Sequence, residues 1–244
     1  MKILVCISHV PDTTSKINFT ENDTKFDTTG VQFIIGPYDD YALARAIELK
    51  EVNPGTLVTV INIGLAETEA TIRKALAIGA DDAIRVNAEP TDSYFVASQI
   101  AEHAQGYDLI LMGRESIDYN GGVVHAMVGE LLGIPSLSPV MKLEIDGTKV
   151  KMEREIEGGH ENVEANLPLV AGCQEPIAEW KIPNMRGIMS ARTKPLKVVE
   201  PKAVDKTVVV QKFEMPPVKG AIKMISADNV AELVTLLKTE AKVL

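Results

Sequence analysis

Short apolar runs rich in β-branched residues recur along the chain and constrain the fold more than any other feature. They are Ile3–Ser8, Leu57–Ile63, Ala83–Val86, Leu109–Gly113 and Leu169–Cys173. Continuous apolar runs of this length are typical of strands buried on both faces of a parallel sheet. Because parallel neighbours need a crossover connection, usually a helix, the runs predict an α/β fold with a doubly wound, mostly parallel sheet.

Helix-like segments with recognisable start and stop signals separate the early strand-like runs. Gly36-Pro37 makes a favourable helix start, and Asp39 follows it where the helix dipole attracts negative charge. Gly79 stands just beyond the second segment, as expected of a helix stop. We therefore expect helices at Tyr38–Glu51, Ala66–Ile78, Asp92–Gln105 and Gly122–Leu132.

Two further stretches have the alternating pattern of β-hairpins. Residues 16–35 alternate polar and apolar side chains around Glu21-Asn22-Asp23. Residues 140–155 alternate in the same way around Asp146-Gly147, and Asp-Gly is a strong signal for a tight hairpin turn. Both stretches are predicted to be hairpins inserted into the α/β domain.

Prolines interrupt the sequence after Cys173, where little periodicity remains. They are Pro176, Pro183, Pro195, Pro201, Pro216 and Pro217. Because proline is disfavoured in helix interiors and central strands, we expect an extended arm here and no further layer. The predicted organisation is an α/β domain at residues 1–176 and an arm at residues 177–244, which ends in a helix at Ala227–Lys242 capped by Ser226.

The basic residues are concentrated in the predicted arm, although the chain as a whole is acidic. The formal net charge is −9, yet residues 181–223 contain ten Lys/Arg and three acids, which gives that segment +7 and leaves −16 for the rest. A strongly acidic body argues against nucleic-acid binding as the main role. The basic segment is either a solvated stretch or a surface that fits an acidic protein partner.

Several features bear on location and on metal chemistry. No apolar run approaches the roughly 20 residues that cross a bilayer, and the opening apolar segment Met1–Ile7 is too short for a signal peptide. We expect a soluble protein without membrane insertion, in the cytoplasm or in a matrix compartment if the source is organellar. Cys6 and Cys173 are expected to be buried thiols. The chain lacks CxxC, HExxH and histidine clusters, so we expect no metal site.

Glycine-containing segments follow the predicted strands at the edge where open parallel sheets bind ligands. Cys6–His9 follows the first strand, Gly36–Asp39 opens a helix, and Ile63-Gly64 ends the second strand. The segment Gly113–Gly122 follows the fourth strand and carries a Gly-Gly pair before an expected helix. Bare N–H groups at a helix start bind anions, so the segment is either a phosphate site or a simple connector.

Motifs for nucleotide chemistry are absent. The chain has no GxGxxG, which argues against an ordinary dinucleotide site, and no GxxxxGK, the loop that cradles phosphates for cleavage. No nucleophile and base stand in an arrangement typical of catalysis. We therefore expect any Rossmann-like nucleotide site here to bind without hydrolysis, and we expect no catalytic residues.

Several motifs follow one another in a distinctive order and spacing over nearly the whole chain: the opening KILVCIS-VPD, the block Ala70–Asp81, the loop Gly113–Asp118, Pro216-Pro217 and the final helix. The most specific is VKMEREIEGGHENVEANLP at Val150–Pro168. Taken together, these motifs resemble the beta, or small, subunit of electron transfer flavoproteins, whose pattern at the last of them is VEREIDGG-E-----LP.

The resemblance implies an electron carrier subunit. Such a subunit pairs with a larger alpha subunit, whose mobile domain holds a redox-active FAD. The heterodimer accepts electrons from acyl-CoA or other flavin dehydrogenases and passes them to a quinone oxidoreductase or another acceptor. Ordinary beta subunits bury an AMP that has no redox role, whereas electron-bifurcating members hold a second FAD in its place.

The resemblance also implies site residues. A nucleotide would contact Cys6, Gly36, Pro37, Tyr38, Asp39, Ile63, Gly64, Gly113, Ser116, Ile117, Asp118, Gly121, Gly122, Val123 and Val124. Glu155 matches a glutamate that helps to position the flavin domain of the partner. Met185 matches the apolar anchor of a recognition loop that docks onto dehydrogenases, and Trp180, Ile188 and Met189 lie in the same loop.

Two segments depart from the family pattern. Bifurcating members favour a DGDTAQVG loop, whereas Asp118–His125 reads DYNGGVVH and also lacks the Asn-Gln-Thr side chains of ordinary members. The phosphate would therefore rely on backbone N–H groups, and AMP is favoured over a second FAD. The recognition loop reads AEWKIPNMRGIMSARTK where the family usually has NEPRYPSLPNIMKAKKK, with Met185 in place of leucine and Trp180 where proline is common. Methionine is an adaptable anchor and tryptophan a typical interface hot spot, so an unusual docking partner is expected.

Three hypotheses remain open from the sequence. The first is an electron carrier subunit with a structural AMP, for which we expect co-purification with a partner and one FAD per heterodimer. The second is the bifurcating type, for which we expect two flavins per heterodimer. The third is a stand-alone ATP-binding domain, for which the isolated chain would turn over ATP.

Overall fold

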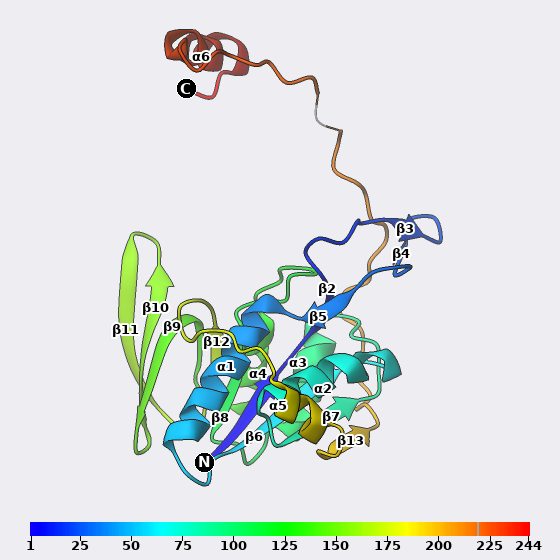
Figure 1. The fold of residues 1–244 in the computed structure, drawn as a ribbon, viewed down its shortest axis with the longest axis vertical. Helices are drawn as coiled ribbons and strands as arrows, with labels where there is room; N and C mark the ends of the chain where they lie inside the picture. Colours follow the sequence, from blue (N-terminus) through cyan, green and yellow to red (C-terminus); the bar gives the residue numbers. More distant parts are fainter. Residues whose placement is uncertain (219) are drawn as a thin grey trace.

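A nine-stranded sheet forms the centre of the molecule in the computed structural model, which describes residues 1–218 and 220–244. The strands run in the order β11-β10-β9-β12-β8-β1-β6-β7-β13 (Figure 1). The strands β1, β6, β7, β8, β12 and β13 are parallel to their neighbours, and they span Lys2–Cys6, Leu57–Ile63, Asp82–Val86, Leu109–Gly113, Leu169–Cys173 and Leu196–Val199. The predicted doubly wound, mostly parallel α/β fold is confirmed.

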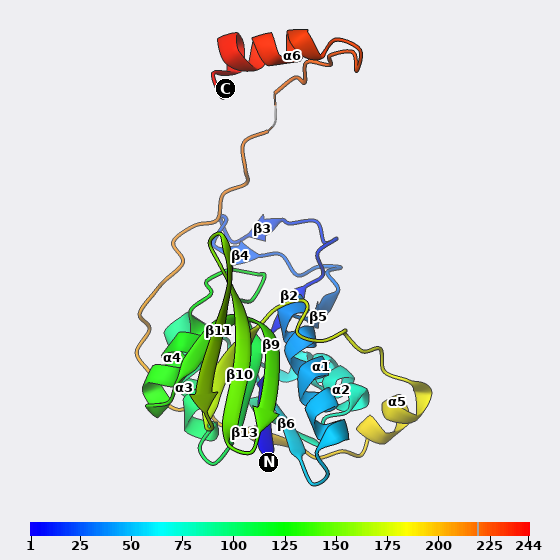
Figure 2. The ribbon, with the colours of Figure 1, turned by 90° about the vertical axis from the view of Figure 1, so that its left-hand side faces the viewer.

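Helices cover both faces of this sheet, as Figure 2 shows. The helices α1 (Pro37–Val52), α2 (Glu69–Ile78) and α5 (Met185–Ala191) pack on one face, and α3 (Ser93–His103) and α4 (Val124–Leu132) pack on the other. Side chains of β1 alternate between the two cores, with Ile3 and Val5 on the α1 side and Leu4 and Cys6 on the α3 side. This two-sided burial explains why the strands are continuous apolar runs in the sequence.

The observed helices match the four expected ones with two differences at their starts. A short 3-10 turn at Ala66–Thr68 precedes α2. The predicted start of α4 at Gly122 is wrong, because α4 begins at Val124 with Val123 at its N-cap. Gly122 has φ +61°, a left-handed conformation that an α-helix does not contain, so the Gly-Gly pair belongs to the loop before the helix.

Both predicted hairpins are confirmed. The smaller one joins β3 (Phe19–Thr20) to β4 (Lys25–Phe26), and nearby β2 (His9–Pro11) pairs with β5 (Phe33–Ile35). The larger one joins β9 (Ser136–Asp146) to β10 (Lys149–Ile156) through the Asp146-Gly147 turn.

A third strand, β11 (Gly159–Asn166), pairs antiparallel with β10 and completes a projecting three-stranded extension of the sheet (Figure 1). The sequence analysis did not assign this strand. The alternating charges on either side of Gly158, which has φ +82°, were the signal for a second tight turn.

The expectation of a wholly extended segment after residue 177 is wrong for residues 185–199. Asn184 caps α5 by accepting a hydrogen bond from the Gly187 N–H at 2.8 Å. A Cβ on Gly187 would lie 2.3 Å from the Ala77 carbonyl oxygen, so glycine allows α5 to lie directly against α2. Pro195 stands just before β13, where its missing N–H costs no ladder hydrogen bond, and β13 then pairs with β7.

Beyond β13 the chain runs as an arm to a last helix that stands clear of the sheet in Figures 1 and 2. This helix is α6 (Val230–Leu236), which continues as a π-helical turn at Leu237–Ala241. Asn229 caps it by accepting from the Glu232 N–H, whereas Ser226 accepts from the Asp228 N–H in the preceding turn, so the predicted Ser226 cap is wrong. Within residues 1–218 and 220–244, no helix has the length and apolar character needed to span a membrane.

Candidate functional site

The order of the strands predicts a ligand-binding crevice at the carboxyl ends of β1 and β8. The chain goes from β1 to β6 and β7 on one side, and then returns to place β8 on the other side of β1. In open α/β sheets such a reversal separates the loops that follow the two strands and leaves a crevice between them. Cys6 ends β1 and Gly113 ends β8, so both predicted contacts stand at this point.

Asp39, in the first turn of α1, joins the ends of these two strands. Its Oδ1 accepts from the Gly113 N–H at 2.8 Å, and its Oδ2 accepts from the N–H and hydroxyl of Ser8 at 2.8 and 2.5 Å. Burial raises the pKa of the Asp39 carboxyl to about 6, against the opposing effect of these hydrogen bonds. Asp39 therefore holds the crevice together and is itself shielded from solvent, since only 5% of it is exposed.

Three of the predicted glycines serve this packing through their lack of a side chain. A Cβ on Gly36 would lie 2.4 Å from the Ser8 Oγ, and one on Gly113 would lie 2.7 Å from the Asp39 Oδ1. A Cβ on Gly64 would lie 2.3 Å from a methyl of Thr68. The N–H of Gly113 already donates to Asp39, so this group is not a free donor for a phosphate.

Arg85 fixes the turn that follows β6. Its guanidinium is buried, and Nη1 donates to the Gly64 carbonyl and to the Asn87 Oδ1, both at 2.9 Å. The Gly64 N–H donates to the Val86 carbonyl at 3.0 Å. Both backbone groups of Gly64 thus have partners within the chain.

The loop after β8 is the part of the crevice with unused hydrogen-bonding capacity. The Ser116 Oγ is buried and has no hydrogen-bond partner among the described residues. Gly121 and Gly122 have open space where a Cβ would stand, with no neighbouring atom nearer than 3.5 Å. Asn120 and Gly122 adopt left-handed φ angles of 50° and 61°, which give the loop its shape before α4. An anion at this loop would find bare backbone and a free hydroxyl.

The structure brings most of the predicted nucleotide contacts to one edge of the sheet. Asp39 of the Gly36–Asp39 turn joins Gly113 to Ser8, two residues after Cys6. Ile63-Gly64 ends the adjacent strand β6, and Ser116–Val124 follows β8. The Cys6 thiol is buried, and burial, with Asp39 nearby, raises its pKa well above the usual value. Cys6 therefore contributes packing and no reactive thiolate.

A chain of polar contacts leads from this crevice to the predicted partner residue Glu155. The Arg114 guanidinium lies 4.9 Å from the centre of the Tyr38 ring, and its Nη1 donates to the Gln174 Oε1 at 2.9 Å. Gln174 in turn donates from its Nε2 to the Glu155 Oε2 at 2.8 Å. Glu115 accepts from Arg114 at 3.0 Å and neutralises its charge.

Sequence reasoning missed Arg114 and Gln174 in this chain. Arg114 follows a strand-ending glycine and Gln174 follows β12, so both stood at strand ends where ligands bind. An isolated Gln gives no sequence signal, because its role depends on what the fold places on each side of it.

The predicted recognition-loop residues are exposed apolar side chains on and before α5. Met185 is 72% exposed, Met189 67% and Trp180 60%, and Ile188 is 40% exposed. Ile182, which sequence reasoning did not single out, is 75% exposed and lies between Trp180 and α5. Exposed apolar side chains clustered along one short segment make it a candidate interaction surface.

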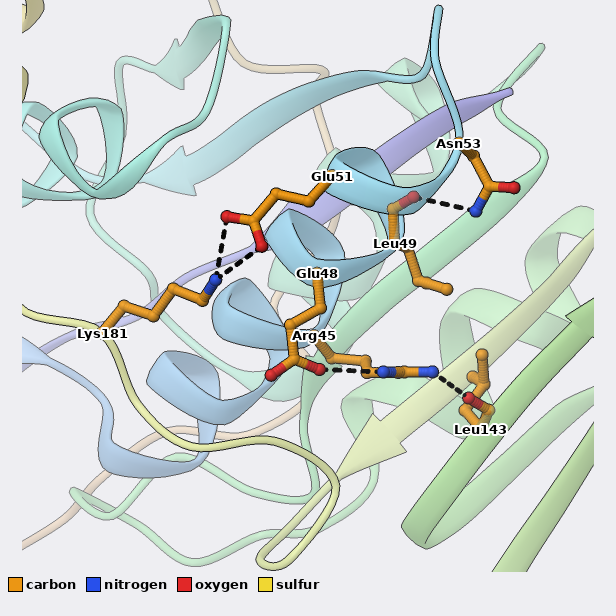
Figure 3. A network of polar contacts seen from close by, with 7 residues as sticks. All are labelled: Arg45, Glu48, Leu49, Glu51, Asn53, Leu143 and Lys181. Carbon is orange, nitrogen blue, oxygen red and sulfur yellow. Dashed lines mark hydrogen bonds and ion pairs between the residues drawn. The ribbon is translucent and has the colours of Figure 1, made fainter.

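A salt bridge attaches this segment to the end of α1 (Figure 3). Lys181 Nζ lies 3.0 and 3.2 Å from the two carboxylate oxygens of Glu51. One helical turn earlier, Arg45 pairs with Glu48 and donates to the Leu143 carbonyl of β9. The apolar segment is thereby supported by the same helix whose first turn builds the crevice.

Comparison with known proteins agrees with this architecture. Residues 23–204 match the family model described as electron transfer flavoprotein domain. An electron transfer flavoprotein subunit beta from Bacillus subtilis is 37% identical, with 100% of both chains covered. One from Syntrophomonas wolfei is 35% identical over 91% of this chain and 88% of its own.

A caffeyl-CoA reductase-Etf complex subunit, CarD, from Acetobacterium woodii is 30% identical and covers 99% of this chain and 98% of its own. The family match covers most of the chain, and the first two relatives extend it across nearly the full length at more than 30% identity. The chain therefore belongs to the electron transfer flavoprotein family, among its beta subunits.

Proposed function

We propose that this chain is one half of a heterodimeric electron transfer flavoprotein that carries electrons from flavin dehydrogenases to a quinone oxidoreductase or another acceptor. In this proposal, FAD is held mainly by an alpha subunit and accepts and releases the electrons. This chain holds a structural AMP, binds the alpha subunit, and supplies no catalytic residue of its own. We place the heterodimer in the cytoplasm of a bacterium.

The observation that carries the proposal is the loop that follows β8, at the β1–β8 reversal of the strand order. This loop offers a buried Ser116 hydroxyl without a partner and open backbone at Gly121-Gly122, and sequence reasoning found no hydrolytic motif there. These features fit a phosphate group that is bound and not cleaved.

In this proposal, different residues at the crevice contact different parts of AMP. Ser116, Gly121 and Gly122 would meet the phosphate with a hydroxyl and with backbone N–H groups. Tyr38 would face the nucleotide from the start of α1, with Arg114 over its ring. AMP supplies no redox chemistry, so the role of these residues is to fix the loops that carry the partner-facing side chains.

The second candidate is the electron-bifurcating type, in which a second FAD takes the place of AMP. The observation in its favour is the match to CarD, a subunit of a caffeyl-CoA reductase-Etf complex, over nearly the whole chain. The DYNGGVVH loop, which departs from the DGDTAQVG pattern of bifurcating members, favours AMP.

The exposed segment around α5 is proposed to dock the electron donor, an acyl-CoA dehydrogenase or another flavin dehydrogenase. Trp180 and Met185 supply the large apolar contacts that interface centres use. Glu155, held by Gln174, is proposed to face the flavin domain of the alpha subunit.

Replacing Gly122 with valine tests the loop assignment. A β-branched residue is strained at φ +61° and would displace the loop from the phosphate. We expect the variant heterodimer to lose AMP during purification, as measured by denaturing extraction and nucleotide chromatography. Gly147→Val, at a matched positive φ of 62° in the distant hairpin turn, is the control and should retain AMP. Equal AMP content in the two variants would refute the loop assignment.

A further inference from the structure

The small hairpin β3–β4 has an unusual turn and no part in the function proposed above. Glu21, Asn22 and Asp23 follow one another in the left-handed region, with φ angles of 51°, 59° and 64°. This region is unfavourable for residues with a side chain, and least so for Asn and Asp. Such strain persists where the surrounding structure imposes it, and it often marks a place with a function.

The turn receives the chain's own arm. The Phe213 N–H donates to the carbonyl oxygen of Asp23, the last of the three left-handed residues, at 2.7 Å. The Phe213 ring stacks on the ring of Phe19 in β3, with centroids 4.9 Å apart and planes 9° from parallel. Lys212 Nζ lies 4.0 Å from the Asp23 Oδ2 and adds an opposite charge. A backbone hydrogen bond, an aromatic stack and an ion pair therefore meet at one turn.

Two further contacts attach the arm upstream of Phe213. The Lys202 N–H donates to the Gln99 Oε1 at 2.8 Å, and the Gln99 Nε2 donates back to the Lys202 carbonyl at 2.9 Å. Asp92 caps α3 with one carboxylate oxygen through the Phe95 N–H at 2.7 Å. With the other oxygen it accepts from Thr207 N–H at 2.8 Å and from Val208 N–H at 3.2 Å. Residues 202–213 are thus fixed along the outside of α3 and up to the hairpin.

The charges of the arm fit this path. Three lysines of the basic segment pair with acids of the body of the same chain: Lys181 with Glu51, Lys202 with Glu102 and Lys212 with Asp23. Each such exposed pair contributes little by itself. Together they show that part of the basic charge is matched to the acidic body of this chain and not to an outside partner.

We infer that the β3–β4 hairpin is an intramolecular binding site for the chain's own arm. It holds the arm at Phe213, so that the residues after Phe213 leave the body at a fixed point. Both views show the arm passing the hairpin and then running out to α6 (Figures 1 and 2). Resting on the proposed function, this arrangement shortens the free segment that carries α6 and raises its effective concentration near a partner that binds the body.

Attachment of the arm to the β3–β4 hairpin can be tested on the full chain without any partner. Cys6 and Cys173 are buried, so spin labels would attach at cysteines introduced at Thr29 and Met215. Double electron–electron resonance on the otherwise unchanged chain should give a narrow distribution of distances between the labels. Asp23→Pro should broaden it at least twofold, because proline cannot adopt a positive φ. Phe213→Ala should broaden it as well. Asn22→Gly relieves strain without removing the Asp23 carbonyl and should leave the distribution narrow.

A broad distance distribution in the parent chain, or an unchanged one in both Asp23→Pro and Phe213→Ala, would contradict attachment of the arm to the hairpin. These outcomes do not depend on the proposed function. If no partner subunit is found, the spin-label result still stands and only the proposed function fails.

The consequence for assembly is tested by association kinetics with the co-purifying partner subunit. Phe213→Ala combined with Thr207→Pro removes the stack on Phe19 and the Thr207 bonds to Asp92, which loosens the arm beyond Lys202. The longer mobile segment should lower the association rate constant about twofold. The dissociation rate constant should be unchanged, because the tail itself keeps its residues. An unchanged association rate constant would contradict the role in capture.

Discussion

The body of the molecule and the arm beyond β13 use apolar residues in opposite ways. In the body, Ile3 and Leu4 are fully buried in the cores on the two faces of the sheet. In the arm, Val218 is 97% exposed and Met224 82%. The body therefore gains its stability from apolar residues buried within the chain, whereas the tail of the arm leaves its apolar side chains exposed, as association surfaces do. Residues 1–199 specify a fold, and the arm at residues 200–244 is the part that we propose specifies an association.

The comparison predicts that removing the Asp39 carboxylate damages the body. Asp39→Ala leaves the N–H groups of Ser8 and Gly113 without an acceptor, and each unsatisfied buried donor costs about 1–3 kcal/mol. We expect the free energy of unfolding at pH 7 to fall by about 3 kcal/mol, measured by urea denaturation. Asp12→Ala, which removes an exposed carboxylate, is the control and should change it by less than about 1 kcal/mol. Equal effects would contradict the Asp39 assignment.

The effect of this substitution should depend on pH. Because burial raises the pKa of Asp39 from 3.8 to about 6, its folded state favours the protonated form. The part of its contribution to stability that depends on protonation is therefore greatest below pH 4 and is lost as the pH rises through 6, while the acceptor role toward Ser8 and Gly113 remains. The difference between the parent and Asp39→Ala should shrink between pH 4 and pH 7, by up to about 3 kcal/mol. A difference that grows with pH would contradict this sign.

Deleting residues 201–244 should have little effect on the stability of the body and a large effect on binding of the partner. The body keeps β13, α5 and both cores, so the free energy of unfolding should change by less than about 2 kcal/mol. Binding of the alpha subunit should weaken at least about 100-fold, or about 2.7 kcal/mol, in an equilibrium titration. A truncated chain that unfolds, or one that binds as tightly as the parent, would erase the distinction between body and arm.

Sequence reasoning found the body better than the arm. The strands of the sheet centre were predictable because burial on both faces leaves continuous apolar runs. The contribution of residues 185–199 was not, because the prolines dominated the local signal. Pro195 turned out to precede β13, and only the tertiary position of the β7 edge decides that this segment becomes a strand.

The candidate site also has features that were predictable from the sequence and others that were not. The glycines at strand ends were visible in the sequence, but the reason for three of them was not. Gly36, Gly64 and Gly113 are needed for close packing, and their neighbours come from distant parts of the chain or from the following helix. The joining role of Asp39, which reaches 74 residues along the chain to Gly113, could not be predicted without the fold.

A smaller effect is predicted for the polar contacts that run from Arg114 through Gln174 to Glu155 in β10. Because Arg114 only donates and the Glu155 carboxylate only accepts, the Gln174 amide fits between them in one orientation. Gln174→Glu keeps the partner of Arg114 but repels Glu155. We expect about tenfold slower reduction of the heterodimer by its dehydrogenase, measured by stopped-flow absorbance, with AMP content unchanged.

The double variant Gln174→Glu/Glu155→Gln restores a hydrogen bond with the roles exchanged. Its hairpin should regain the parent's resistance to proteolysis, whereas reduction stays slow if the carboxylate must stand at position 155. If Glu155→Gln alone changes nothing, Glu155 has no role in transfer. If it acts and Gln174→Glu does not, then Gln174 does not position it.

The smallest effect is expected at the exposed segment around α5. Met185→Ala removes one largely exposed apolar side chain and should weaken docking of the dehydrogenase about threefold to tenfold. The expected change is in the Michaelis constant for the heterodimer, with its assembly unaffected. Val52→Ala, which truncates a side chain of equal exposure (73%) at the end of α1, is the control and should leave the constant unchanged. Equal constants for the two variants would place the docking surface elsewhere.

The most direct test of the division between body and arm is to purify the chain with its natural partner, denature the complex and identify every nucleotide released. The account predicts one alpha subunit, one FAD and one AMP per heterodimer, with AMP lost in Gly122→Val and the alpha subunit lost on deletion of residues 201–244. Two FAD molecules and no AMP would contradict the structural-AMP assignment. A colourless homodimer would contradict the account as a whole.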